Sequence, residues 1–175
     1  MKSLKDYIIP FRGLKIGVHN FKFDINKELF EFFESSEVID AKVKALVEME
    51  RKETMLILNF KLHGQLKLQC SRCLGDLDFP VEAEETLYIK FGSEEADEGS
   101  DDIRVLSDKD NDLDISKDVY EYIMLQVPFQ VLHPDDEDGE STCDPAILER
   151  LQGFSKENTI DPRWEALNKL KKDKE

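Results

Sequence analysis

Two alternating runs on either side of a Cys-x-x-Cys motif constrain the fold of this chain more than any other feature. Apolar and polar residues alternate over 56–68 and again over 77–91, and a period of two predicts strands that bury one face. The short connection between the runs contains Cys70, Cys73 and a glycine, so we expect two antiparallel strands joined by a tight loop. We take this hairpin as the centre of the fold.

Further alternation on both sides extends the sheet. Residues 38–47 alternate cleanly, which predicts a third long strand and an antiparallel meander over 36–91. The alternation over 14–25 fits either a hairpin or one bent strand, and Ile103–Leu106 is a candidate short strand. These patterns predict an α+β fold, in which an antiparallel meander of long strands is covered by a few short to medium helices.

Helices are predicted from their start and stop signals. Asn26 is a preferred N-cap for a short helix over 27–34. Asp114 is expected to cap an amphipathic helix that Pro128 ends, and this helix should cover the open face of the sheet. Two later helices should begin where Asp precedes Pro, because helix N-termini prefer that pair. The first of these helices is expected to run from Asp144-Pro145 through Leu151, and the second is a C-terminal helix over residues 162–173.

The chain is expected to form a single domain, residues 1–175. Its hydrophobic content of 40% is enough for a core. Residues 1–13 should be an extended lead-in. Two acidic stretches, 92–102 and 133–143, are expected to be solvated loops, and the first lacks the ligand spacing of an EF-hand.

The formal net charge of −15 limits the partners that the surface can attract. It opposes broad attachment to nucleic acid or anionic membrane, so RNA contact would need a local basic patch or a protein partner. No stretch approaches the roughly 20 apolar residues of a membrane span, and the N-terminus lacks signal-peptide features, which together indicate the cytoplasm. The basic candidates for a local RNA contact are Lys2, Lys5, Arg12, Lys15 and the lysines from Lys169 to Lys174.

The cysteines allow three interpretations. Their number, 3, argues against a secreted disulfide framework. Cys70 and Cys73 could form half of a zinc site. The other two ligands could come from a second copy in a dimer, or from Cys143 and His133, although those two residues are spaced more widely than usual. Alternatively they could be a redox pair with Arg72 favouring the thiolate, but flanking strands provide no helix N-terminus to lower a thiol pKa. The third interpretation is two structural or vestigial thiols.

Motifs of the common enzyme classes are missing from the sequence. There is no phosphate-binding glycine loop, no GxSxG, no HExxH and no DNA-reading motif. The histidines lie far apart, and none belongs to a nucleophile motif. The sequence therefore indicates none of these classes.

Three motifs in a fixed order resemble a bacterial protein family. They are Cys70-Ser71-Arg72-Cys73-Leu74 after an alternating strand, the segment from Asp114 to Pro128, and the closing Asp161-Pro162-Arg163. This set is similar to the YceD family of large ribosomal RNA subunit accumulation proteins, over about Leu14 to Leu170. Many relatives have a second cysteine cluster where this chain has Leu132-His133-Pro134, so a four-cysteine site is not carried over.

The resemblance implies a non-enzymatic role in the synthesis or accumulation of large-subunit ribosomal RNA, and hence in large-subunit assembly in bacteria. It implies as partner a ribosome-assembly or RNA-processing protein, or the large-subunit RNA precursor, and no membrane or small-molecule substrate. Arg72 and Arg163 are candidate partner contacts. No cofactor is expected unless Cys70 and Cys73 bind zinc. The alternatives are a small zinc-binding or thiol-redox protein, and an acidic interaction module whose loops mimic nucleic acid.

Overall fold

The computed structural model describes residues 5–35, 37–92, 103–107 and 109–156, and within these the chain forms two compact units. The first unit spans residues 1–132 and the second spans residues 133–175. The C-terminal helix expected over 162–173, Arg163, Lys2 and the C-terminal lysines lie outside the described residues, as does the acidic stretch after Gly92. The single-domain organisation stays a prediction.

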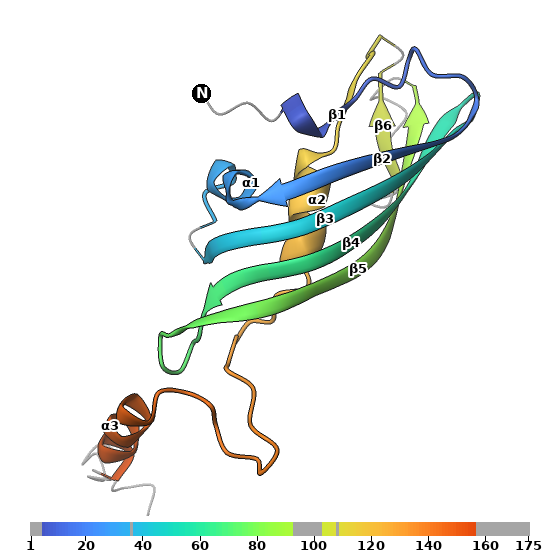
Figure 1. The fold of residues 1–175 in the computed structure, drawn as a ribbon. Helices are drawn as coiled ribbons and strands as arrows, with labels where there is room; N and C mark the ends of the chain where they lie inside the picture. The colour runs from blue at the N-terminus through green and yellow to red at the C-terminus, as the bar shows by residue number, and fades with distance from the viewer. Residues whose placement is uncertain (1–4, 36, 93–102, 108, 157–175) are drawn as a thin grey trace, which may run out of the picture. The chain divides into compact units, whose positions relative to one another are not determined.

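The first unit is built around a five-stranded sheet with the order β2-β3-β4-β5-β6 (Figure 1). The strands are β2 (Gly17–Asn26), β3 (Val38–Arg51), β4 (Met55–Gln69), β5 (Asp76–Phe91) and β6 (Ile103–Leu106). Strands β2 to β5 form an antiparallel meander, as the alternation predicts, and β6 pairs with β5 in parallel. The α+β fold is therefore confirmed, and the alternation over 14–25 belongs to one strand and not to a hairpin.

The alternating residues of the sheet bury one face. On β4 the predicted core residues Leu56, Leu58, Phe60 and Leu62 are all buried. Helix α2 (Ser116–Met124) lies against this face (Figure 1). It buries Val119 and Ile123 completely, and the Tyr122 ring meets the Phe60 ring edge-on at 5.2 Å. The amphipathic helix therefore covers the open face of the sheet, as expected.

Helix α1 (Lys27–Phe32) begins where Asn26 ends β2. The Asn26 side chain accepts a hydrogen bond of 3.0 Å from the Glu28 amide, which satisfies one of the free N–H groups of the first turn. The predicted N-cap is confirmed. Phe33, at the end of this helix, stacks on Tyr120 of α2 with ring centroids 4.5 Å apart, and Phe30 contacts the same ring at 5.9 Å, so the two helices share an aromatic cluster.

The N-terminal lead-in is not simply extended. A 3-10 turn, η1 (Lys5–Tyr7), is followed by β1 (Ile8–Ile9), which pairs with β7 (Leu113–Asp114) in a small two-stranded sheet. Tyr7 and Ile9 are buried in the core. The lead-in is therefore a packed element, and its strand β1 pairs with the chain just before α2.

Both ends of α2 differ from the prediction. Asp114 belongs to β7, and Ile115 is at the N-cap position; the Asp114 carboxylate still accepts a 2.8 Å hydrogen bond from the Ser116 amide, so it caps from one position earlier. The helix ends at Met124 and not at Pro128. The Val127 amide bonds to the carbonyl three residues before it at 3.1 Å, so tighter turns replace the helix before the proline is reached.

One ion pair ties α2 to the edge of the sheet. Arg104 of β6 donates to the Asp118 carboxylate at 3.0 Å and to the Asp114 carbonyl at 3.3 Å. Burial raises the pKa of Asp118 above its usual value of 3.8, and Arg104 only partly opposes this. Burial, and then the Asp118 charge, raise the pKa of Tyr122 to about 12.

We expect Gly64→Ala to lower the free energy of unfolding by about 1–3 kcal/mol, the usual range for overpacking. Gly64 pairs with Val43, and a Cβ at position 64 would lie 2.6 Å from the Val43 Cα and still closer to the Lys42 carbonyl oxygen. Backbone on the neighbouring strand cannot rotate away as a side chain can. The measurement is urea-induced unfolding, and Gly13→Ala is the control because its Cβ would meet nothing within 4 Å. Equal losses in both variants would contradict the close approach.

Asp118 should make stability depend on pH in an unusual direction. A raised pKa in the folded state means that the folded protein binds the proton more tightly than the unfolded chain. Stability from this group therefore rises as pH falls through the folded pKa, and levels off below about 3.8. We expect the unfolding free energy of the wild type, minus that of Asp118→Asn, to increase between pH 7 and pH 4. At pH 7 we expect the two proteins to differ by about 1 kcal/mol or less. A difference that shrinks on acidification would show that the Arg104 charge dominates.

Candidate metal centre

Cys70 and Cys73 lie in the turn that joins β4 to β5, where the sequence places them. The turn is closed by hydrogen bonds from the Cys70 amide to the Gly75 carbonyl at 2.8 Å and from the Leu74 amide to the Cys70 carbonyl at 2.9 Å. The Arg72 amide points at the Cys70 sulfur from 3.4 Å, and such a bond favours a thiolate. Both thiols are buried and neither is in a disulfide. We call residues 70–75 the cysteine turn.

The acidic stretch 133–143 is a loop whose residues 134–140 are exposed, as expected, and which is also folded by hydrogen bonds of its own. Asp136 organises it, because its carboxylate accepts hydrogen bonds from the amides of Asp138 and Glu140 at 3.0 and 2.8 Å. Asp135 and Ser141 form a bridge, and Thr142 donates to the Pro134 carbonyl at 2.6 Å. These contacts fold the loop back on itself and bring its two ends together.

The ends of this loop are the two remaining candidate ligands. The Cys143 sulfur lies 3.7 Å from Nδ1 of His133, although the residues are ten positions apart. Asp144 then accepts from the Ala146 amide at 2.8 Å and starts α3 (Pro145–Lys156), which extends beyond the predicted end at Leu151. The wide spacing in sequence is therefore no obstacle to shared ligation.

The cysteine turn also holds the chain that leads to His133. The Ser71 amide donates to the Val131 carbonyl at 2.7 Å, and the Val131 amide donates to the Ser71 hydroxyl at 3.3 Å. This pair of bonds fixes Val131, close to the end of the first unit, against the turn.

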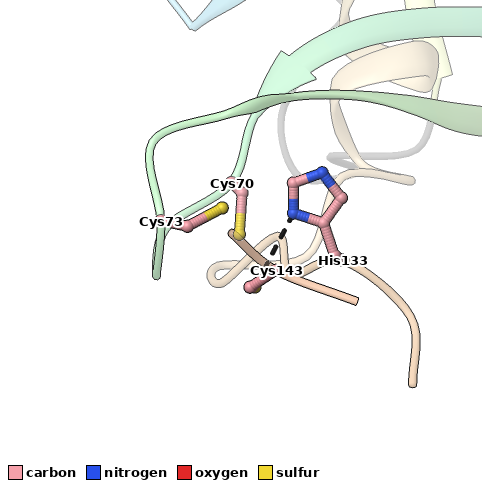
Figure 2. Close-up of side chains that lie close together, drawn as sticks. All are labelled: Cys70, Cys73, His133 and Cys143. Atoms are coloured by element: carbon pink, nitrogen blue, oxygen red, sulfur yellow. Dashed lines mark hydrogen bonds between the residues drawn. The ribbon is translucent and has the colours of Figure 1, made fainter. Parts of the chain in front are cut away.

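One donor atom from each of Cys70, Cys73, His133 and Cys143 lies within 4.8 Å of the others (Figure 2). These are the four residues that the sequence nominates as metal ligands. The cysteines are 0%, 2% and 4% exposed, in chain order, and buried cysteine and histidine side chains that converge in this way are typical of a structural zinc site.

The donor set fits zinc in number, type and spacing. Zinc in structural sites takes four sulfur or nitrogen ligands at about 2.3 and 2.0 Å in a tetrahedron, which separates neighbouring donors by roughly 3.5–3.8 Å. The 3.7 Å between Cys143 and His133 matches this separation, and the upper limit of 4.8 Å needs only a small contraction. With four protein ligands, no position is left for water or substrate, so the site would stabilise structure and not catalyse a reaction.

Thiol exchange is less well supported by the surroundings of the cysteine turn. Strands precede and follow it, so the turn does not itself begin a helix, as the cysteine motif of thioredoxin-like proteins does. The thiols are also buried, whereas redox-active cysteines need an accessible sulfur.

The proposed contacts with a partner are only partly described. Arg72 lies half-buried in the cysteine turn, next to the candidate ligands. Of the basic residues nominated for RNA contact, Lys5, Arg12 and Lys15 are described, and Arg12 bonds to the 109–111 segment through its guanidinium. Arg12 therefore has a structural role that the charge pattern does not reveal.

No described helix has the length and apolar content that crossing a membrane requires.

Comparison with known proteins points to one family. The profile described as "Large ribosomal RNA subunit accumulation protein YceD" matches residues 58–171. The curated relative "Uncharacterized protein YlbN" of Bacillus subtilis (strain 168) is 28% identical over 159 residues, which cover 87% of this chain and 89% of that protein. No solved structure matches. The matched region contains the cysteine turn, α2 and all four candidate ligands.

Proposed function

Because this chain belongs to the YceD family of large ribosomal RNA subunit accumulation proteins, we propose that it is a non-enzymatic accessory factor in large-subunit assembly. In this role it promotes synthesis or accumulation of large-subunit ribosomal RNA by binding an assembly partner in the cytoplasm. The family match over 58–171 is the observation that carries the proposal. The motifs that suggest the resemblance in sequence lie almost entirely within that range.

The electrostatics of the described residues support binding rather than catalysis. Among the described residues other than the four candidate ligands, Tyr7, Asp118 and Tyr122 have a clearly displaced pKa, and burial is the first cause in each case. Tyr7 stacks on Phe23 and Tyr122 packs on Phe60, so these groups belong to the packing of the sheet. Active sites usually displace the pKa of groups that line a cleft.

The charge of the chain supports a protein partner. A net charge of −15 repels phosphate groups over most of the surface and attracts basic proteins. A basic ribosomal or RNA-processing protein therefore fits the surface better than the RNA precursor does. In this proposal the acidic loops contribute to solubility and to the long-range attraction of that partner.

We also propose that Cys70, Cys73, His133 and Cys143 bind one zinc ion with a structural role. Zinc supplies a four-way link that holds the cysteine turn and the 133–143 loop in fixed positions. The protein's own contribution is a turn whose Arg72 amide faces a ligand sulfur and a loop that Asp136 folds in advance. The sequence suggests a zinc-binding protein as an alternative function. A zinc ion with a purely structural role is compatible with the assembly role, so both proposals can hold together.

The assembly role predicts a specific defect in ribosome content. Deleting the gene in its host should lower mature large-subunit RNA relative to small-subunit RNA and reduce the large-subunit peak in a sucrose gradient, because assembly intermediates without the factor are degraded. Expression of the wild-type chain should restore both. An unchanged RNA ratio together with an unchanged gradient profile would refute the assembly role.

The zinc proposal predicts one zinc per chain in protein purified without a metal column. His133→Ala and Cys143→Ser should each weaken zinc binding by more than roughly 10–100-fold, because each removes a direct ligand. Loss of a residue that only hydrogen-bonds to a ligand typically costs roughly 10–100-fold in metal affinity. Elemental analysis gives the stoichiometry, and a competing chromophoric chelator gives the affinity. The matched control is His63→Ala, an exposed histidine on β4, which should retain the full zinc content. A metal-free protein whose unfolding is insensitive to added zinc would exclude the site.

A further inference from the structure

A groove with a volume of about 400 Å³ opens beside the cysteine turn, and all of its lining residues belong to the unit of residues 1–132. Three segments form its walls: the start of β3, the cysteine turn, and the chain that follows α2. Its apolar lining includes Ile39, Leu68, Leu74, Val127, Phe129 and Val131. The volume is within the range of about 300–1,000 Å³ that is usual for binding pockets.

Two large apolar side chains of this groove are exposed to solvent. Phe129 is 101% exposed and Leu74 is 65% exposed. Leu125, two residues before the lining residue Val127, is 75% exposed. Single exposed apolar residues are ordinary, but apolar side chains gathered around one groove mark a binding surface.

Leu74 is also held in a costly backbone conformation. Its φ is 60°, in the left-handed region where a residue with a Cβ loses roughly 1–2 kcal/mol and where glycine is favoured. The next residue is Gly75, so a glycine is available in the turn but does not occupy the strained position. Strain of this kind is found where a side chain serves function, and here it presents Leu74 to the groove.

The groove is held in shape before any partner arrives. Ser71 and Val131, which both line it, exchange two hydrogen bonds and join the cysteine turn to the segment after α2. The Gln69 side chain, also in the lining, donates to the Leu74 carbonyl at 3.0 Å. A preformed groove loses little conformational entropy on binding, which favours affinity.

The charges indicate the kind of occupant. Glu37 lies exposed in the wall of the groove, and the whole chain carries a net charge of −15. A second copy of this chain would also carry a net charge of −15 and RNA would bring phosphates, so long-range electrostatics disfavour both as occupants. A cationic protein segment is attracted, and complementary charges accelerate such an encounter.

We propose that this groove binds a basic protein segment that inserts a large apolar side chain against Leu74 and Phe129. The proposal rests on the assembly role and identifies the surface through which that role is carried out. Basic residues of the partner approach Glu37 and the surrounding negative field, and the apolar side chain displaces water from the groove. Aromatic anchors at the centre of an interface commonly dominate its affinity.

The test uses the full chain and proteins extracted from purified large ribosomal subunits, free of RNA, as the probe. Benzoylphenylalanine at position 129 should cross-link to one or a few basic proteins of that extract on irradiation. The same group at Tyr88, an exposed aromatic residue on β5, is the matched control and should give no such adduct. The affinity of the cross-linked protein is then measured with the purified pair.

Phe129→Ala should weaken binding of that protein by about tenfold or more, as expected for an interface anchor, while Tyr88→Ala leaves it within about twofold. Leu74→Gly separates function from folding. Because glycine adopts a positive φ freely, this variant should keep or raise the melting temperature and yet bind more weakly. A purely structural role for Leu74 would not weaken binding.

Other outcomes overturn the groove proposal. They are an adduct between two copies, an adduct to residues 133–175 of the same chain, stronger binding to naked ribosomal RNA than to the extracted proteins, and an unchanged affinity of Phe129→Ala. None of them alters the RNA ratio of the deletion strain, which tests the assembly role alone. Conversely, an unchanged RNA ratio with intact groove binding would refute the assembly role and leave the groove in place.

Discussion

The antiparallel pairing of β4 with β5 is the interaction on which the rest of the structure depends. It runs without a break from Met55 opposite Lys90 to Gln69 opposite Asp76. A slip of one residue would turn every side chain of a strand to the opposite face, so burial of residues such as Phe60 and Val81 fixes the register. The register in turn fixes where the strands stop pairing, and the cysteine turn begins at that point.

The cysteine turn connects the sheet to the two proposed binding features. Its sulfur atoms point into the group of four candidate ligands, and its Ser71 bonds anchor the segment that carries Phe129 and Val131. The turn therefore contributes Cys70 and Cys73 to the candidate metal centre, and Cys70, Ser71 and Leu74 to one wall of the groove. The proposed zinc site and the groove therefore depend on one backbone conformation, that of the cysteine turn.

Much of the fold could be predicted from local pattern. The alternation over 56–68 and 77–91 predicted β4, β5 and the turn between them, and the side-chain chemistry of Asn26 predicted the start of α1. Two predictions at the ends of α2 were wrong. Asp114 pairs with Ile8 of β1 and so becomes a strand residue, which is a contact distant in sequence that no local pattern shows. The helix ends at Met124 because tighter local turns replace it before Pro128 is reached.

The sequence by itself determined which atoms were available: two cysteines in a strand connection, a third cysteine, and a histidine ten positions before it. It could nominate Cys70, Cys73, His133 and Cys143, but it could not show that they meet. Only the tertiary structure decided that, because closing the 133–143 loop depends on hydrogen bonds that the Asp136 carboxylate accepts and that the Thr142 hydroxyl donates, which no periodicity encodes. The groove beside Leu74 likewise exists only because three segments distant in sequence converge. The exposure of Phe129 in this groove cannot be predicted from the residues around it in the sequence.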